Sequence, residues 1–185
     1  MQRIILIIFL FLLGLSAQAQ EMLTSKKFDF VSSINTGVNT DFYNSNFSMA
    51  VTNGVIMNQR YMLSLGLGIE GNQTGTQLPM FFEGKYLFLK NRKKTPFISV
   101  TSGYLQPLYR NYWQNVQGGF TAGAQIGFQN FFSDHVGIST SVGYRYWRQR
   151  GEQNYYYYDI MPFYGNGAYI YISNRFEVRL ALLFK

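Results

Sequence analysis

The sequence has 185 residues with a formal net charge of +7, 18% aromatic residues, only 14% charged residues and no cysteine. Because soluble domains carry roughly a quarter charged residues, this composition is unsuited to a surface that faces water. Without cysteine the fold holds no disulfide, and with one histidine neither a first-row metal site nor any other cofactor is expected.

Residues 1–19 have the three parts of a secretory signal peptide. Arg3 provides a positive start, Ile4–Leu15 is an unbroken apolar run, and Ala17-Gln18-Ala19 is a small-x-small cleavage site. The apolar run is too short to span a bilayer comfortably as a helix. We therefore expect a cleaved signal peptide at 1–19 and one mature domain at 20–185.

After the signal, apolar residues recur at every second position, which is the periodicity of β-strands. The cleanest example is residues 61–70, where Leu63, Leu65 and Leu67 alternate with serine and glycine. The predicted strands are residues 28–38, 47–57, 61–70, 77–89, 96–108, 120–129, 136–147 and the segment that follows residue 167. Since none of these approaches about 20 consecutive apolar residues, a helical membrane protein is excluded.

The last strand shows how the two faces are used. Phe176, Leu180 and Phe184 lie on one face of it, and Arg175 and Arg179 lie on the other. In a transmembrane barrel the apolar face contacts lipid and the polar face lines the lumen. The signal peptide and the series of similar segments favour this interpretation over a soluble, lipocalin-like barrel.

Turns and loops alternate in length along these strands. The short ones are at 58–59, 90–95 and 133–134, and the longer ones are at 39–45, 71–76, 109–117 and 148–167. Outer-membrane barrels have short periplasmic turns and long extracellular loops. The sequence therefore predicts an eight-stranded antiparallel up-and-down transmembrane β-barrel with both termini in the periplasm. Ten strands is the alternative, because residues 161–175 resemble residues 78–92.

Five segments resemble the small outer-membrane β-barrel proteins of Bacteroidetes, within the OmpA/OmpX-like barrel group. They are LGLGIE (Leu65–Glu70), LPMFFEGKYLF (Leu78–Phe88), TPFISVTSGY (Thr95–Tyr104), VGYRY (Val142–Tyr146) and NRFEVRLALLF (Asn174–Phe184). The resemblance covers nearly the whole mature chain and implies a barrel domain in the cell outer membrane. No segment of the sequence resembles the peptidoglycan-binding domain of full-length OmpA-type proteins. The resemblance also implies that the barrel-assembly machinery reads the terminal aromatic Phe184, although Lys185 after it departs from the family pattern.

Two motifs suggest chemistry at first inspection. Gly66-x-Gly68-x-x-Gly71 matches the dinucleotide fingerprint, but that fingerprint needs a following helix, and no helical periodicity follows here. We interpret the glycines as space for large lumen side chains. His135 with Asp134 could serve a lipid-modifying barrel enzyme only if it converged with serine near the outer leaflet. Both residues fall at a predicted periplasmic turn, so no catalytic residue is expected.

The charges predicted to face inward are more informative, and Asp29 is expected to join them. They are Glu70, Glu83, Lys85, Arg145, Glu177 and Arg179. An eight-stranded barrel is just wide enough for side chains to fill it, and buried charges must pair. A salt-bridged plug is therefore favoured over the alternative, a narrow passive channel.

Tyrosine-rich loops are the remaining candidates for function. Tyr112 and Trp113 fall in one loop and Tyr155, Tyr156, Tyr157 and Tyr158 in another, where rigid amphipathic side chains can form a contact surface. A membrane-interface aromatic girdle is the competing interpretation and is favoured for Tyr144, Tyr146 and Trp147.

Arg110, Arg148 and Arg150 are placed to contact the phosphates of lipopolysaccharide. We expect a structural or surface-binding protein whose partners are outer-membrane lipids and an unidentified envelope or surface protein, and not nucleic acid.

Overall fold

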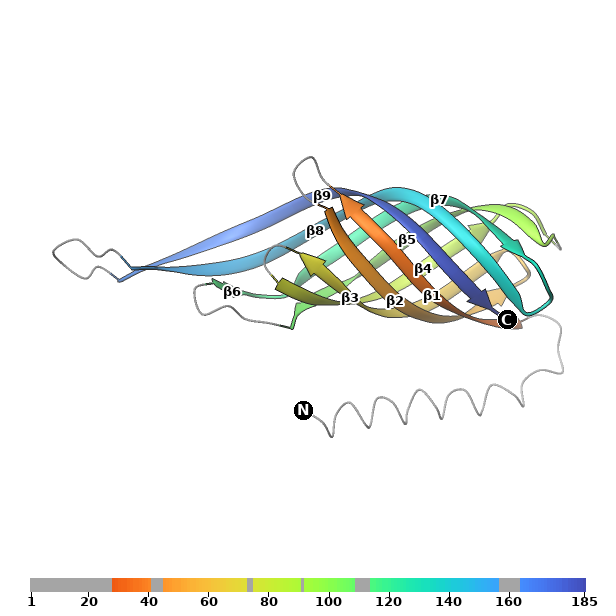
Figure 1. Cartoon of the computed structure of the whole chain (residues 1–185), viewed down its shortest axis with the longest axis horizontal. Coiled ribbons are helices and arrows are strands. Elements are labelled where there is room, and N and C mark those ends of the chain that lie inside the picture. The colour runs from red at the N-terminus through yellow and green to blue at the C-terminus, as the bar shows by residue number, and fades with distance from the viewer. Residues whose placement is uncertain (1–27, 41–44, 73–74, 91, 109–113, 157–163) are drawn as a thin grey trace, which may run out of the picture.

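A computed structural model describes residues 28–40, 45–72, 75–90, 92–108, 114–156 and 164–185. The predicted signal peptide at 1–19 lies outside these residues. None of the described residues forms a helix that is long and apolar enough to cross a membrane. The described chain is built from antiparallel strands that form one sheet (Figure 1).

The strands within the described residues follow one another by short connections. They are β1 (Phe28–Thr40), β2 (Ser45–Met57), β3 (Tyr61–Asn72), β4 (Gly75–Leu87), β5 (Lys94–Pro107), β6 (Gln114–Val116), β7 (Gly119–Phe131), β8 (Val136–Tyr156) and β9 (Tyr164–Phe184). All except β6 pair in the order β8-β7-β5-β4-β3-β2-β1-β9, and β9 pairs with β8 to close the barrel. The predicted eight-stranded antiparallel barrel is confirmed, and the ten-strand alternative is wrong.

One end of the barrel carries the short turns and the C-terminus. In the β2–β3 turn Asn58 and Gln59 both have positive φ (52° and 58°), and the N–H of Arg60 donates to the carbonyl oxygen of Met57 at 3.1 Å. This is the backbone of a type I′ hairpin turn, whose twist matches that of the flanking strands. The β4–β5 and β7–β8 connections lie at the same end, which is called the turn end below.

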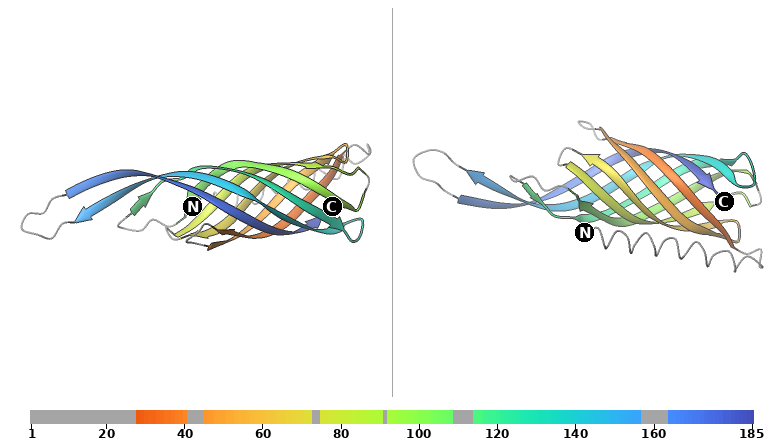
Figure 2. Two further views of the ribbon diagram at one scale, coloured as in Figure 1. Left: turned by 90° about the horizontal axis from the view of Figure 1, so that it is seen from above. Right: turned by 60° about the horizontal axis from the view of Figure 1, so that its bottom comes forward.

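At the opposite end, β8 and β9 continue past the other strands (Figures 1 and 2). Their register runs without interruption from Val136↔Phe184 to Tyr156↔Tyr164. The prediction of a loop at 148–167 is therefore wrong for most of its length, because the two strands supply each other's backbone partners. We call residues 149–156 of β8 and 164–171 of β9 the β8–β9 ribbon. Part of the predicted loop 109–117 also forms β6, which pairs with residues 151–153 of β8.

The two faces of each strand differ as the alternation predicts. On β9 the outward side chains Phe176 and Val178 are 59% and 58% exposed, whereas the inward Arg175 and Glu177 are 3% and 2% exposed. The same contrast holds on the other barrel strands, so the exterior is apolar and the interior is rich in polar groups. This arrangement is the reverse of a soluble barrel.

Inward glycines make room for large lumen side chains. A Cβ atom on Gly66 would lie 2.3 Å from the ring of Phe81, and one on Gly127 would lie 2.5 Å from the ring of Phe97. Both aromatic rings therefore lie against bare backbone of another strand. Gly66 belongs to the apparent dinucleotide fingerprint, and its role here is steric.

Candidate functional site

The candidate site is the lumen, where the structure places all six inward charges that the sequence predicts. Glu70 comes from β3, Glu83 and Lys85 from β4, Arg145 from β8, and Glu177 and Arg179 from β9. Each lies on the inward face because its position has the inward parity of its strand. Five of them, all except Lys85, are joined by ion pairs across the barrel.

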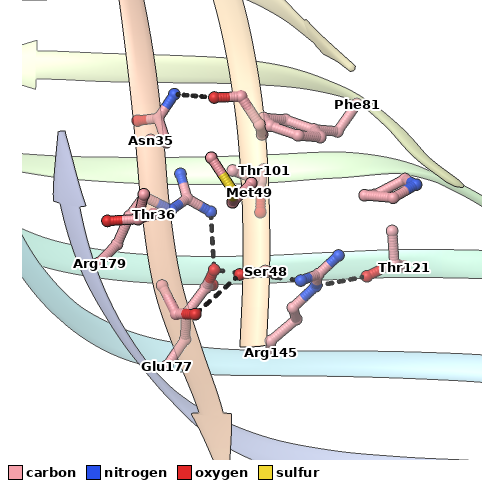
Figure 3. Close-up of a pocket in the computed structure, with 13 residues that line it drawn as sticks. Asn35, Thr36, Ser48, Met49, Phe81, Thr101, Thr121, Arg145, Glu177 and Arg179 are labelled. Carbon is pink, nitrogen blue, oxygen red and sulfur yellow. Dashed lines mark hydrogen bonds and ion pairs between the residues drawn. The ribbon is translucent and has the colours of Figure 1, made fainter. Parts of the chain in front are cut away.

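Arg145 and Arg179 connect three glutamates in one chain of contacts, and Figure 3 shows both arginines with Glu177. Arg145 Nη1 lies 2.8 Å from Glu70 Oε2 and 4.0 Å from Glu177 Oε1. Arg179 Nη2 lies 2.9 Å from Glu177 Oε1, and its Nη1 lies 3.5 Å from Glu83 Oε1. Glu177 is thus the central carboxylate, shared by both arginines.

Neutral side chains add hydrogen bonds to this network, although Arg179 Nη1 and Asn39 Oδ1 have no hydrogen-bond partner among the described residues. Gln125 Nε2 donates to Glu177 Oε2 at 2.6 Å, and Asn39 Nδ2 donates to Glu70 Oε1 at 3.1 Å. Arg145 Nε donates to the hydroxyl of Thr121 at 3.2 Å. A buried polar network with its members paired is rigid, whereas an unpaired charge there costs several kcal/mol.

Lys85 has a different environment from the other inward charges. Its Nζ lies 4.4 Å from the centroid of the Phe97 ring, and the residue is 7% exposed. A cation over an aromatic face is stabilised by the ring quadrupole. Lys85 therefore lies at the boundary between the charged network and the apolar side chains nearer the turn end.

An apolar layer lies in the lumen at the turn end, on the side formed by β1–β5. Its five members come from five different strands, and each is at most 5% exposed. They are Val31, Ile56, Met62, Leu87 and Phe97. The lumen therefore holds an apolar layer below the charged network on one side, while Thr95, Gln129 and Ser139 are buried polar residues at the same end.

The free space beside the network is small. The cavity lined by Arg145, Glu177 and Arg179 has a volume of about 20 Å³ (Figure 3). A site of this size accommodates roughly one water molecule. The lumen is thus packed at the level of the ion pairs.

Trp147 and Arg175 form a contact that the sequence interpretation missed. Trp147 was expected in the aromatic girdle, but it is 2% exposed and points inward, because it shares the strand parity of Arg145. The guanidinium carbon of Arg175 lies 4.3 Å from the centroid of the Trp147 ring, and Arg175 Nε donates to the hydroxyl of Ser173 at 3.0 Å. Odd-numbered residues of β8 and β9 face the lumen, and this alternation in the sequence could have placed both residues there.

His135 lies at the turn end and not within the charged network. Its backbone N–H donates to Ser133 Oγ at 3.2 Å, and its carbonyl oxygen accepts from the backbone N–H of Lys185 at 2.8 Å. Lys185 Nζ also forms an ion pair with Asp29 at 2.7 Å, so Asp29 belongs to the rim of the barrel. The geometry gives His135 a role in the turn that anchors the end of the chain.

The predicted surface aromatics fall largely where no side chain is described. Tyr112, Trp113, Tyr157 and Tyr158 lie outside the described residues. Tyr155 and Tyr156 are the last two residues of β8 and pair with Gly165 and Tyr164 of β9. Phe184 ends β9 on the outward face and is 38% exposed.

Comparison with known proteins shows a shared fold but no family relationship. No protein-family model matches the sequence, and no curated protein matches it. Among solved structures, the chain is similar to Neisserial surface protein A (NspA), with 12% identity, a TM-score of 0.51, and coverage of 85% of this chain and 96% of that one. It is also similar to the outer membrane protein OprG from Pseudomonas aeruginosa, with 10% identity, a TM-score of 0.59 and the same coverage of both chains. The fold is that of the small eight-stranded barrels found in outer membranes.

Proposed function

We propose that this chain is a non-enzymatic outer-membrane barrel with a closed lumen, which acts as a structural or surface-binding protein through the parts that project from it. The observation that carries the proposal is the stacking of the paired charge network on the apolar layer, inside an apolar exterior. The turn end would face the periplasm and the β8–β9 ribbon the cell exterior, as in barrels with short periplasmic turns. Assignment to the Bacteroidetes group rests on the sequence resemblance alone.

The alternative is a narrow passive channel, and the packing of the lumen argues against it. In planar bilayers the purified protein is expected to show no steady conductance above the lipid baseline, because ion pairs join strands across the lumen and the cavity beside them holds roughly one water molecule. Heat-modifiable mobility on gels serves as the control that the barrel was folded. Discrete, steady current steps from folded protein would favour the channel.

The outer lipid leaflet is the proposed environment of the exposed arginines. Arg148 and Arg150 lie on the outward face of β8 and are exposed, opposite the exposed Ile172 and Ile170 of β9. Cationic side chains at this level attract anionic headgroups, and the phosphates of lipopolysaccharide are the proposed contact. Arg110, which was expected to act with them, lies outside the described residues.

Phe184 is proposed as the residue that the barrel-assembly machinery recognises. Removing Phe184 and Lys185 together is expected to lower the amount of folded barrel in the outer membrane while export across the inner membrane continues. Heat-modifiable mobility of the membrane fraction measures this. Lys185→Ala is the control, since it removes only the ion pair with Asp29 and leaves the terminal aromatic. Equal folded yield of the truncated and full-length chains would contradict the proposal.

A further inference from the structure

One edge of the β8–β9 ribbon has no strand beside it within the described part of the chain. β1 pairs with β9 only between Phe176 and Phe184, whereas β9 continues to Tyr164. On the other side of the ribbon, β6 pairs with β8, and the N–H of Gln117 donates to the carbonyl oxygen of Arg150 at 2.7 Å. The ribbon therefore has one partly covered edge and one open edge.

The backbone groups on the open edge follow from the register. The N–H of Lys185 points toward β8, where it donates to the carbonyl oxygen of His135. Because successive residues of an antiparallel strand direct their N–H and C=O groups to alternate sides, the even-numbered residues of β9 direct theirs away from β8. The carbonyl oxygen of Arg150, opposite Ile170, agrees with this assignment because it points toward β6. The open edge of the ribbon is formed by Tyr164, Asn166, Ala168 and Ile170, and Ile172 continues it toward the barrel.

The sequence of this edge lacks the features that normally protect an edge strand. Residues 164–174 contain no charged residue and no proline. Native proteins usually protect such edges with lysine, proline or a bulge, because an open edge pairs with another extended strand. The side chains of Ile170 and Ile172 are 53% and 54% exposed beside it.

We propose that the open edge of β9 pairs in antiparallel fashion with the same edge of a second copy of this chain, inserted in a facing membrane. This inference rests on the proposed function, which places the ribbon outside the cell. Two copies in one membrane both have β9 running toward that membrane, an orientation that opposes antiparallel pairing. Two copies in facing membranes have their β9 strands running in opposite directions.

The composition of the edge fits a second copy as the partner. A twofold contact joins the same surface of both subunits, so each residue meets the same short segment of the other chain. Like charges opposite each other destabilise paired strands, and no charge lies between Tyr164 and Asn174 to produce such repulsion. The contact would link two cells, or two membrane vesicles, through a continuous four-stranded sheet.

Vesicle clustering tests the proposal directly. The barrel is reconstituted into two populations of phosphatidylcholine vesicles, one with a donor lipid dye and one with an acceptor, and energy transfer and light scattering are measured after mixing. Vesicles that carry the barrel are expected to cluster with each other and not with protein-free vesicles. Absence of clustering, or equal clustering with protein-free vesicles, would overturn self-pairing.

A matched pair of variants separates the open edge from the ribbon as a whole. Asn166 of β9 and Asn154 of β8 are cross-strand partners. Each directs its backbone N–H group away from the partner strand, toward the outer edge of the ribbon. Asn166→Pro is expected to reduce clustering by about tenfold, because it removes an N–H from the open edge without removing a β8–β9 bond. Asn154→Pro makes the same change at the opposite edge and is expected to leave clustering unchanged. Equal loss in both variants would contradict pairing through β9.

The same vesicles distinguish failure of this inference from failure of the proposed function. Heat-modifiable mobility and conductance report whether the barrel is inserted, folded and closed. Inserted, closed barrels that do not cluster would refute self-pairing and leave the proposed function intact. A chain that does not insert would refute both.

Discussion

Replacing Arg145 with methionine is expected to lower the free energy of unfolding by about 3–5 kcal/mol, the cost of leaving a buried charge without its partner. Arg145 is the near partner of Glu70, at 2.8 Å, and Glu70 is 0% exposed. In the variant the carboxylate of Glu70 would lose its ion pair with Arg145 and keep the hydrogen bond from Asn39. Reversible denaturant unfolding in lipid vesicles measures the change.

The double variant shows whether the stranded charge is the cause. Glu70→Gln in the Arg145→Met background removes the unpaired carboxylate, so much of the lost stability should return. If the double variant is as unstable as Arg145→Met, the loss comes from the changed shape of the lumen and not from the charge.

Introducing arginine at Leu180 is expected to destabilise the barrel by about 2–4 kcal/mol, because a charge on the lipid face near mid-membrane has no aqueous environment. Leu180 is on the outward face of β9, next to the inward Arg179 that pairs with Glu177. Unfolding in vesicles measures this change as well, and the free energy of unfolding is the quantity to compare.

Ile172→Arg provides the control for position along the strand. Ile172 lies on the same face of β9 but pairs with Arg148, beyond the last residue of β9 that contacts β1. The cost of a charge on the lipid face falls to about 0–1 kcal/mol near the interface. If both variants lowered the free energy of unfolding equally, the cost of a charge on the exterior of β9 would not depend on membrane depth.

The sequence was sufficient to predict which side chains of each strand face lipid and which face the lumen. This is because the alternation of apolar and polar residues is a local property of each strand. The alternation of residues 176–184 is sufficient to put Leu180 outside and Glu177 inside, and the structure agrees. The alternation of side chains along β8 also places Trp147 inward, but the preference of tryptophan for membrane interfaces led to the opposite assignment. Where the two disagree, the position of a residue in the strand is a better guide to its facing than its residue type.

The contacts within the lumen were not predictable, because they depend on register between strands far apart in the chain. The sequence predicts that the inward charges pair, but not which glutamate pairs with which arginine. The structure selects Glu177 and Glu83 for Arg179, while Glu70 pairs with Arg145. The length of the ribbon was missed for a similar reason. Glycine, asparagine and tyrosine at 164–171 are typical of a loop until an opposite strand supplies hydrogen bonds.

The position of Glu177 and Arg179 on the final strand has a consequence for folding kinetics. These two residues connect Arg145 of β8 with Glu83 of β4, so the charges of the earlier strands cannot all be paired before β9 arrives. The pairing of β9 with β1 also joins the first and the last of the described strands, so it has the highest sequence separation of the strand pairings among the described residues. Contacts of this kind form slowly. Completion of the ion pairs and closure of the cylinder should therefore occur in the same late, cooperative step.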